Sequence, residues 1–298
     1  MMKVNKRSAL ALLLVFLYGC GSPYSFTEYD NYRIERFTFQ YPEGLLPSDE
    51  VFMQADQGDF SAQYSVGIYY RGQRSAKARD YLISAGENGI TDAFYHLGML
   101  YFDGYMIRGG SGLSSLITIY ASLASDRTSS DPDLLYISYE TAFKYLQLAA
   151  EAGNIRAQNT VGFMLRDGIG VEQDIELSCR WFEKAHRSAY AKGSLNYAAC
   201  LTGANRISAL KAAADVNAVA AFELGLEYQI MDELQQTLSL TESEPETSEE
   251  PSIFQSYGVD LESNYDSIAA SWFKTSADLG YQEATVRIYL LEEISDMD

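Results

Sequence analysis

The sequence predicts an all-α protein built as a solenoid of helix pairs. Three observations predict this fold. A short phrase with a helical apolar spacing recurs along the chain, a second phrase recurs between its copies, and the copies return after roughly 30–36 residues or about twice that distance. Periodic units of this length are single supersecondary motifs that bury their apolar faces only by stacking on one another. The repeats therefore predict the architecture.

The first phrase begins at a small residue and predicts a helix buried on one side. Its clearest copies begin at Ala62, Ala93, Ala157 and Ala220, and Gly193 and Ala284 hold the same place in weaker copies. In the first copy Ala62, Val66 and Tyr70 follow the i, i+4, i+8 spacing of a single helix face. A Gly follows the Val or Leu in the clear copies, which predicts close approach of a neighbouring helix.

The second phrase predicts the other helix of each pair. It combines an aromatic or Leu pair, small residues and a final Gly, which is suited to the left-handed end of a helix. The three full copies cover residues 81–89, 145–153 and 272–280, a fourth runs from Trp181 to Ala185, and a degenerate fifth runs from Ser208 to Val216. Residues 51–58 predict one more second helix ahead of the first complete unit.

The loop from Asp167 to Asp174, with its D-G-x-G-V-x-x-D pattern, is the most specific element. Together with the two phrases it resembles the Sel-one-like repeat (SLR) family, which is related to the tetratricopeptide repeat. The resemblance covers about residues 50–290 and implies a right-handed α/α superhelical solenoid of five or six helix pairs. Tyr197-Ala198 and Ile288-Tyr289 depart from the family's Leu-Gly step.

The first 19 residues predict an export signal. Lys3, Lys6 and Arg7 precede an apolar run that is too short to span a bilayer of about 30 Å. Residues 17–20 resemble the lipobox of bacterial lipoproteins, which implies that Cys20 is lipidated and that residues 20–47 form a tether. The resemblance also implies a lipid anchor at the periplasmic face of the outer membrane; ordinary secretory cleavage and an uncleaved anchor remain alternatives.

The chain is strongly acidic, with 41 Asp and Glu against 22 Lys and Arg. Removal of the signal would leave a net charge of about −22. This balance argues against nucleic acid and against direct contact with anionic lipid surfaces, and it suits a basic protein partner. The alternative is that the acidity only keeps an exported protein soluble.

Two cysteines remain once Cys20 is set aside. Cys179 and Cys200 lie 21 residues apart, on consecutive predicted helices. A disulfide between them is sterically possible in an oxidising compartment, but two buried free thiols are the expectation.

Two units carry insertions between their helices, at about residues 105–137 and 231–262. The second insert is rich in Glu and low in hydrophobicity, which predicts disorder. The first contains an apolar stretch from Leu113 to Leu123, which strengthens the case for a partner-binding appendage, while simple padding remains the alternative for both inserts. The solenoid with both insertions would extend over residues 48–298.

The sequence supports no catalytic or metal-binding constellation. No group of His, Cys, Asp or Glu has metal-ligand spacing, and no cofactor motif is present. A Ser-x-x-Lys pattern occurs at Ser208–Lys211 and Ser271–Lys274, but the partner motifs of penicillin-recognising enzymes are missing. We interpret both matches as coincidences within the repeat.

A ladder beside the apolar stripe is the expected partner surface. The third and seventh residues after the first residue of each first phrase share one helix face, and the family resemblance places the first helices on the concave side. The candidates are Ser65, Tyr69, His96, Leu100, Thr160, Met164, Asn196, Glu223 and Glu227. The alternative is that half of these positions only pack between units.

The family resemblance implies a non-enzymatic scaffold that binds another protein on its concave face and inserted loops. One specific version is an immunity protein that neutralises a secreted toxin such as a phospholipase effector. The alternative is an assembly lipoprotein of an envelope or polysaccharide-export complex. A β-lactam or peptidoglycan-processing enzyme is the remote alternative.

Overall fold

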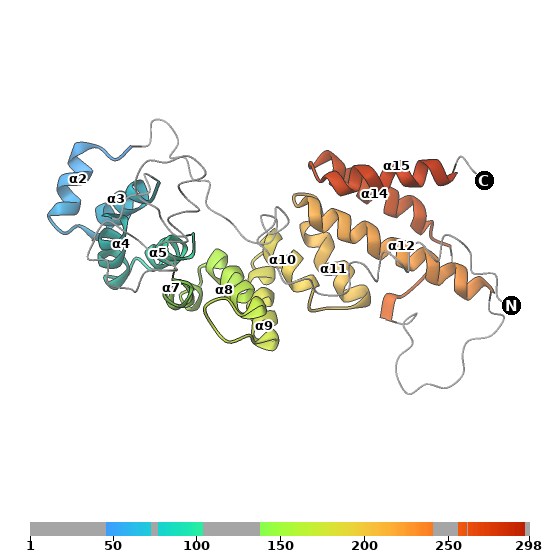
Figure 1. Ribbon diagram of the computed structural model, residues 1–298, viewed down its shortest axis with the longest axis horizontal. Coiled ribbons are helices and arrows are strands. Elements are labelled where there is room, and N and C mark those ends of the chain that lie inside the picture. Colours follow the sequence, from blue (N-terminus) through green and yellow to red (C-terminus); the bar gives the residue numbers. More distant parts are fainter. Residues whose placement is uncertain (1–45, 73–76, 104–137, 241–255, 261, 296–298) are drawn as a thin grey trace, which may run out of the picture. The chain divides into compact units, whose positions relative to one another are not determined.

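The computed structural model describes residues 46–72, 77–103, 138–240, 256–260 and 262–295, and every regular element in these ranges is a helix (Figure 1). The helices belong to two compact units, one within Ile34–Ser188 and the other within Ala189–Asp298. The two units are described separately below.

The N-terminal unit begins with helix α2 (Asp49–Asp56) and continues with three helix pairs. The pairs are α3 (Phe60–Gly72) with α4 (Lys77–Glu87), α5 (Asp92–Asp103) with α7 (Tyr139–Glu151), and α8 (Ile155–Asp167) with α9 (Ile175–Arg187). The two helices of each pair contact one another, and α4 and α7 also contact the first helix of the next pair (Figure 1).

The C-terminal unit repeats this plan. Its pairs are α10 (Ala191–Ala198) with α11 (Gly203–Ala214) and α12 (Ala218–Leu240) with α14 (Tyr265–Asp278), followed by α15 (Gln282–Ser295). Here α11 contacts α12, and α14 contacts α15. The prediction of an all-α solenoid of helix pairs is confirmed, and the helix expected at residues 51–58 is α2.

The repeated small and apolar residues form the core. Ala93, Ala157 and Ala220 have no solvent exposure, and neither do Val161 and Leu224, which lie four residues after Ala157 and Ala220. The i, i+4 stripe therefore faces inward, as the spacing predicts.

The glycine of the first phrase is required by close helix packing. A Cβ atom at Gly162 would lie 2.7 Å from the Phe182 ring, and one at Gly225 would lie 2.7 Å from the Phe273 ring. Because these distances are below any normal contact, the ring of each second helix occupies the space that a larger residue would need. The two phrases thus interlock within one pair.

Helix ends follow the sequence signals closely. Gly89 and Gly153 adopt φ values of 100° and 96°, in the left-handed region that favours glycine. The residues after them close the helix ends, with Ile90 N donating to the Ala85 carbonyl at 3.0 Å and Asn154 N to the Ala149 carbonyl at 2.9 Å. Each pair is thereby joined to the next by a short, defined turn.

Helix α12 is longer than expected. The second insert was predicted from residue 231, but the helix continues to Leu240 because Met231 is buried against the core of this unit. The side-chain amide of Gln235 donates to the backbone carbonyls of Asp260 and Ser263 at 3.0 and 2.9 Å. These bonds connect the C-terminal part of α12 to the residues that follow the insert. The rest of both inserts lies largely outside the described residues, as do the signal segment, Cys20 and almost all of the tether.

Both Cys179 and Cys200 are disulfide-bonded and partly exposed. The expectation of two buried free thiols is therefore wrong. Neither cysteine belongs to the buried stripe of its helix, so neither sulfur atom lies in the core. Within the described part of the chain, no helix is both long and apolar enough to cross a membrane.

Candidate functional site

Six of the nine residues of the predicted partner ladder are buried, among them Glu223 and Glu227 at 9% and 6% exposed. The other four, Leu100, Thr160, Met164 and Asn196, are at most 2% exposed. Leu100 packs in the same core cluster as Ala93 and Leu97, because a first helix is covered both by its own second helix and by neighbouring repeats. The expected ladder is therefore not a solvent-facing surface at these six positions.

Three other candidates, Ser65, Tyr69 and His96, are partly exposed in the N-terminal unit, and so is Tyr64. Tyr64, Ser65 and Tyr69 come from α3 and His96 comes from α5, and these two first helices contact one another directly. The Tyr64 ring meets the His96 ring edge to face, with centroids 5.8 Å apart. We call these four residues the first-helix surface. Tyr64 was not among the predicted site residues, although it is adjacent to Ser65.

Tyr69 is held in place by an aromatic cluster. Its ring lies 5.5 Å from Phe52 of α2 and 5.3 Å from Tyr70, and Tyr70 stacks on Tyr81 of α4 at 5.8 Å. Aromatic pairs of this geometry fix ring orientation and add to the stability of their surroundings. The orientation of Tyr69 is thus set by its neighbours within the fold.

A buried arginine lies beneath this surface. Arg71 is 1% exposed, and its Nη1 donates to Nδ1 of His96. Burial, with the charges of Arg71 and Arg156, holds the pKa of His96 well below its usual value. The imidazole is therefore neutral near pH 7 and accepts at Nδ1. The sequence carried a signal for Arg71, because Arg166 occupies the same place, nine residues after its repeat alanine.

The Tyr64 phenol is also kept in its neutral form. Burial, together with the negative charge of Asp92, raises its pKa. Asp92 in turn accepts from Asn154 Nδ2 at 2.8 Å, which joins α5 to the start of α8. The first-helix surface therefore offers a neutral phenol, a neutral imidazole and a hydroxyl to solvent.

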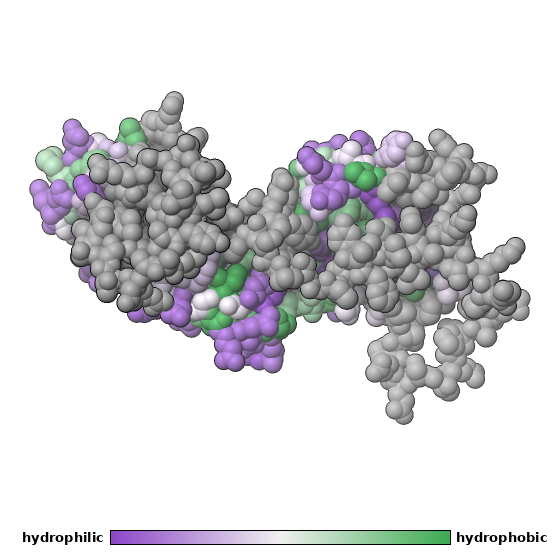
Figure 2. Space-filling model, in the orientation of Figure 1, coloured by the Kyte–Doolittle hydropathy of each residue, from purple (hydrophilic) through white to green (hydrophobic). Residues whose placement is uncertain are grey.

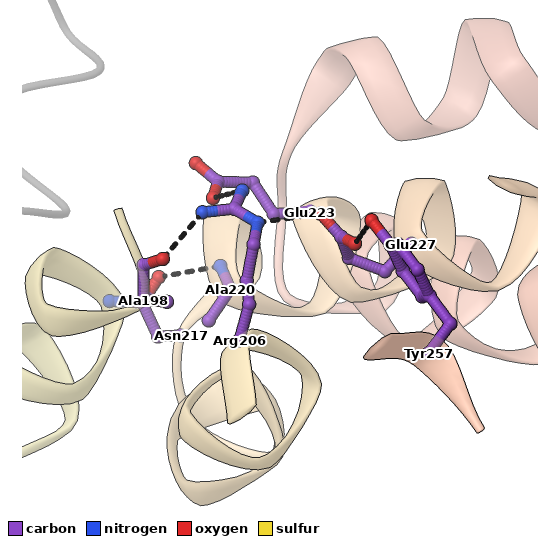
Figure 3. A network of polar contacts seen from close by, with 7 residues as sticks. All are labelled: Ala198, Arg206, Asn217, Ala220, Glu223, Glu227 and Tyr257. Carbon is purple, nitrogen blue, oxygen red and sulfur yellow. Dashed lines mark hydrogen bonds and ion pairs between the residues drawn. The ribbon is translucent and has the colours of Figure 1, made fainter. Parts of the chain in front are cut away.

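The two predicted glutamates belong to an ion network in the C-terminal unit (Figure 3). Arg206 of α11 donates through Nη2 to Glu223 at 2.8 Å and through Nε to Glu227 at 2.5 Å. Its Nη1 also donates to the Ala198 carbonyl at 2.8 Å. Burial opposes the charged form of Arg206, but the two carboxylates raise its pKa overall. Glu223 and Glu227 are thus engaged inside the fold.

The segment at residues 256–260 completes the network. The Tyr257 hydroxyl donates to Glu227 Oε2 at 2.8 Å. Burial of the phenol and, to a lesser extent, the negative charge of Glu227 raise the pKa of Tyr257. A Cβ atom at Gly203 would lie 2.3 Å from the Ser256 carbonyl oxygen, so only glycine lets this segment pass. Arg206 and Tyr257 could not be found from a repeat pattern, because the insert separates them in sequence.

The Ser-x-x-Lys matches lie on exposed helix faces. Lys274 pairs with Asp278 at 3.6 Å, and the Lys211 ammonium lies 5.4 Å from the centre of the Tyr228 ring. Ser271 accepts through its carbonyl from Thr275, as a helical residue does. Across the described ranges, no three His, Cys, Asp or Glu side chains are grouped so as to hold a metal ion.

Comparison with known proteins agrees with the repeat pattern. A family model described as Sel1 repeat matches residues 60–90, 91–109, 136–154, 155–187 and 253–281. No curated protein sequence matches the chain.

The solved structures that are similar to the chain include a Sel1 repeat protein and a protein with an SLR fold. A Sel1 repeat protein from Oxalobacter formigenes is 17% identical with a TM-score of 0.49, and the alignment covers 78% of this chain and 73% of that one. The protein c5321, a protective antigen of uropathogenic Escherichia coli strains with an SLR fold, is 21% identical with a TM-score of 0.34, covering 82% of this chain and 59% of that one.

Proposed function

The chain is a Sel1-repeat protein, and we propose that it is a non-enzymatic scaffold that captures another protein on the first-helix surface and the inserted segments. Sel1 repeat proteins generally mediate protein–protein interaction. The observation that carries the proposal is the group of partly exposed, preoriented side chains at Tyr64, Ser65, Tyr69 and His96. Tyrosine supplies a large contact area at a low cost in conformational entropy, and it is enriched among residues that dominate binding.

The scaffold acts at the periplasmic face of the bacterial outer membrane, anchored through a lipid on Cys20. The basic and apolar order of residues 1–19 supports export. The disulfide-bonded state of Cys179 and Cys200 also supports it, because structural disulfides persist in oxidising compartments. A Cys20→Ser variant is expected to leave the detergent phase on Triton X-114 partition, whereas a wild-type chain in the aqueous phase would contradict the anchor.

The partner is a basic protein, and a secreted toxin neutralised by this chain is the leading candidate. The excess of 41 acidic over 22 basic residues supports this choice, because complementary charge accelerates association. If a toxin gene lies beside this one, deletion of this gene alone should be lethal and deletion of both should not. Survival of the single deletion would contradict the immunity role and favour the assembly role.

Capture from the cell envelope tests the scaffold directly. Tagged full-length protein, purified from detergent-solubilised envelope, should carry one partner that mass spectrometry identifies. A Tyr64→Ala/Tyr69→Ala variant should lose it, and Met53→Ala, which alters a 57% exposed side chain on α2, should keep it. Equal recovery of the same proteins on all three would contradict capture by the first-helix surface.

A further inference from the structure

A second surface of the N-terminal unit forms an open groove of about 510 Å³. Its walls come from α7, the end of α8 and the loop that leads into α9. Apolar side chains line it at Phe143, Leu165, Val171 and Leu177, and polar ones at Gln147 and Glu172. The volume is within the range of about 300–1,000 Å³ that is usual for ligand-binding clefts.

The loop that forms one wall depends on two glycines and one hydrogen bond. Gly168 ends α8 with a φ of 68°, and Gly170 has a φ of 69° at a point where a Cβ would lie 2.3 Å from the Tyr139 backbone. Gln173 donates to the Arg166 carbonyl at 2.6 Å. The two glycines permit the path of this loop, the Gln173 hydrogen bond ties it to the end of α8, and Val171 and Glu172 thereby line the groove.

The groove carries an unbalanced negative charge. Glu172 is exposed and makes no ion pair with any residue that the structure describes. The cations near it in the chain are already engaged, since Arg166 pairs with Asp167 at 2.7 Å and Arg180 pairs with Glu176. A cationic group from outside would therefore find an unneutralised carboxylate at the edge of the groove.

Apolar surface continues beyond the groove. Leu177 is 37% exposed, and Ile175, two residues earlier, is 52% exposed. Figure 2 shows hydrophobic surface directly beside strongly polar surface over α8 and α9. Adjoining apolar and acidic surface suits a ligand that combines an apolar side chain with positive charge.

We propose that this groove binds a segment of the partner protein in which an apolar side chain is flanked by Lys or Arg. The apolar side chain would enter between Phe143 and Leu177, and the cationic group would pair with Glu172. This inference rests on the proposed scaffold function and names the chemistry of the partner. It adds a contact site distinct from the first-helix surface.

Fluorescence anisotropy with the full-length protein tests the groove. The probe is a fluorescein-labelled amphipathic peptide of Lys and Leu, compared with a Glu and Leu peptide of equal length. The Lys/Leu peptide should bind and the Glu/Leu peptide should not. Glu172→Gln should weaken binding about 3- to 5-fold, and Leu177→Ser about 10-fold, since one partly solvated charge pair contributes less than a buried apolar contact.

Two matched variants control for overall charge and exposure. Glu87→Gln removes one exposed carboxylate from α4, and Leu279→Ser alters a leucine that is 40% exposed in the other unit. Both should bind the Lys/Leu peptide as wild type does. Equal weakening by control and groove variants, or binding of both peptides alike, would overturn the proposal. If the groove variants lose peptide binding but the protein still captures its partner from the envelope, the groove proposal is supported. If envelope capture fails while the peptide still binds the groove, only the scaffold function is contradicted.

Discussion

Burial and the neighbouring Arg71 guanidinium together set the protonation state of His96. The guanidinium of Arg71 donates to Nδ1 of His96, so protonation at that nitrogen would replace an attraction with a repulsion. The pKa of His96 is accordingly lowered well below its usual value. Because the unfolded chain takes up this proton near pH 6.5 while the folded chain does not, the contribution to stability is present at higher pH and is lost as the pH falls below about 6.5.

Urea unfolding at several pH values checks this sign. Between pH 7.5 and 5.5, wild type should lose stability relative to His96→Gln, by up to about 1.4 kcal/mol for each pH unit below 6.5. The variant retains a side chain that can accept a hydrogen bond but cannot titrate. Parallel pH profiles for the two proteins would contradict a neutral imidazole at this position.

Arg206 is the residue on which the C-terminal network depends. An Arg206→Met variant would leave Glu223 and Glu227, which are 9% and 6% exposed, without their shared cation. Removal of one partner from a buried ion pair costs about 3–5 kcal/mol. Chemical denaturation should show a loss of this size, whereas Arg180→Met, which breaks an exposed pair, should change stability by about 0.5 kcal/mol or less. A small loss for Arg206→Met would show that the network is not structural.

At the scale of the helix pair, the interlock of glycine and ring explains why the repeat is so regular. Gly162 with Phe182 and Gly225 with Phe273 make the same contact in different units. A Gly162→Ala variant should lose about 1–3 kcal/mol because the added Cβ overpacks the contact. The Gly162→Ala/Phe182→Leu double variant should lose less than the sum of the two single changes, as measured by urea unfolding. Strict additivity would show that the two positions do not touch.

The same regularity determines what could be foreseen from the sequence. Every clear unit has an Ala, a Val or Leu and a Gly at the positions of Ala62, Val66 and Gly67. Spacing alone was therefore enough to predict the helix and its buried face. The burial of Leu100 and Met164 depends on neighbouring helices, which spacing within one helix cannot show. The extension of α12 past Met231 depends likewise on contacts with the rest of its unit, including those that Gln235 makes to residues after the insert.

At the scale of the whole molecule, the repeat determines the shape and the departures from it provide distinctive surface. The first-helix surface, the complete loop at residues 167–174 and the return of the chain at residues 256–260 each occur in one unit only among the described residues. The acid excess is unevenly distributed, because residues 138–230 carry 10 Asp and Glu against 9 Lys and Arg. In the proposed scaffold, recognition therefore depends on a few local features of a regular array.

Site-specific photo-cross-linking in living cells tests the central claim most directly. A benzophenone amino acid replaces Tyr64, Tyr69 or, as a control, Val216, which is 73% exposed on a turn of the other unit. The account predicts that irradiation joins one and the same partner protein to positions 64 and 69 and not to position 216. Equal adducts at all three positions, or adducts only at position 216, would contradict partner capture by the first-helix surface.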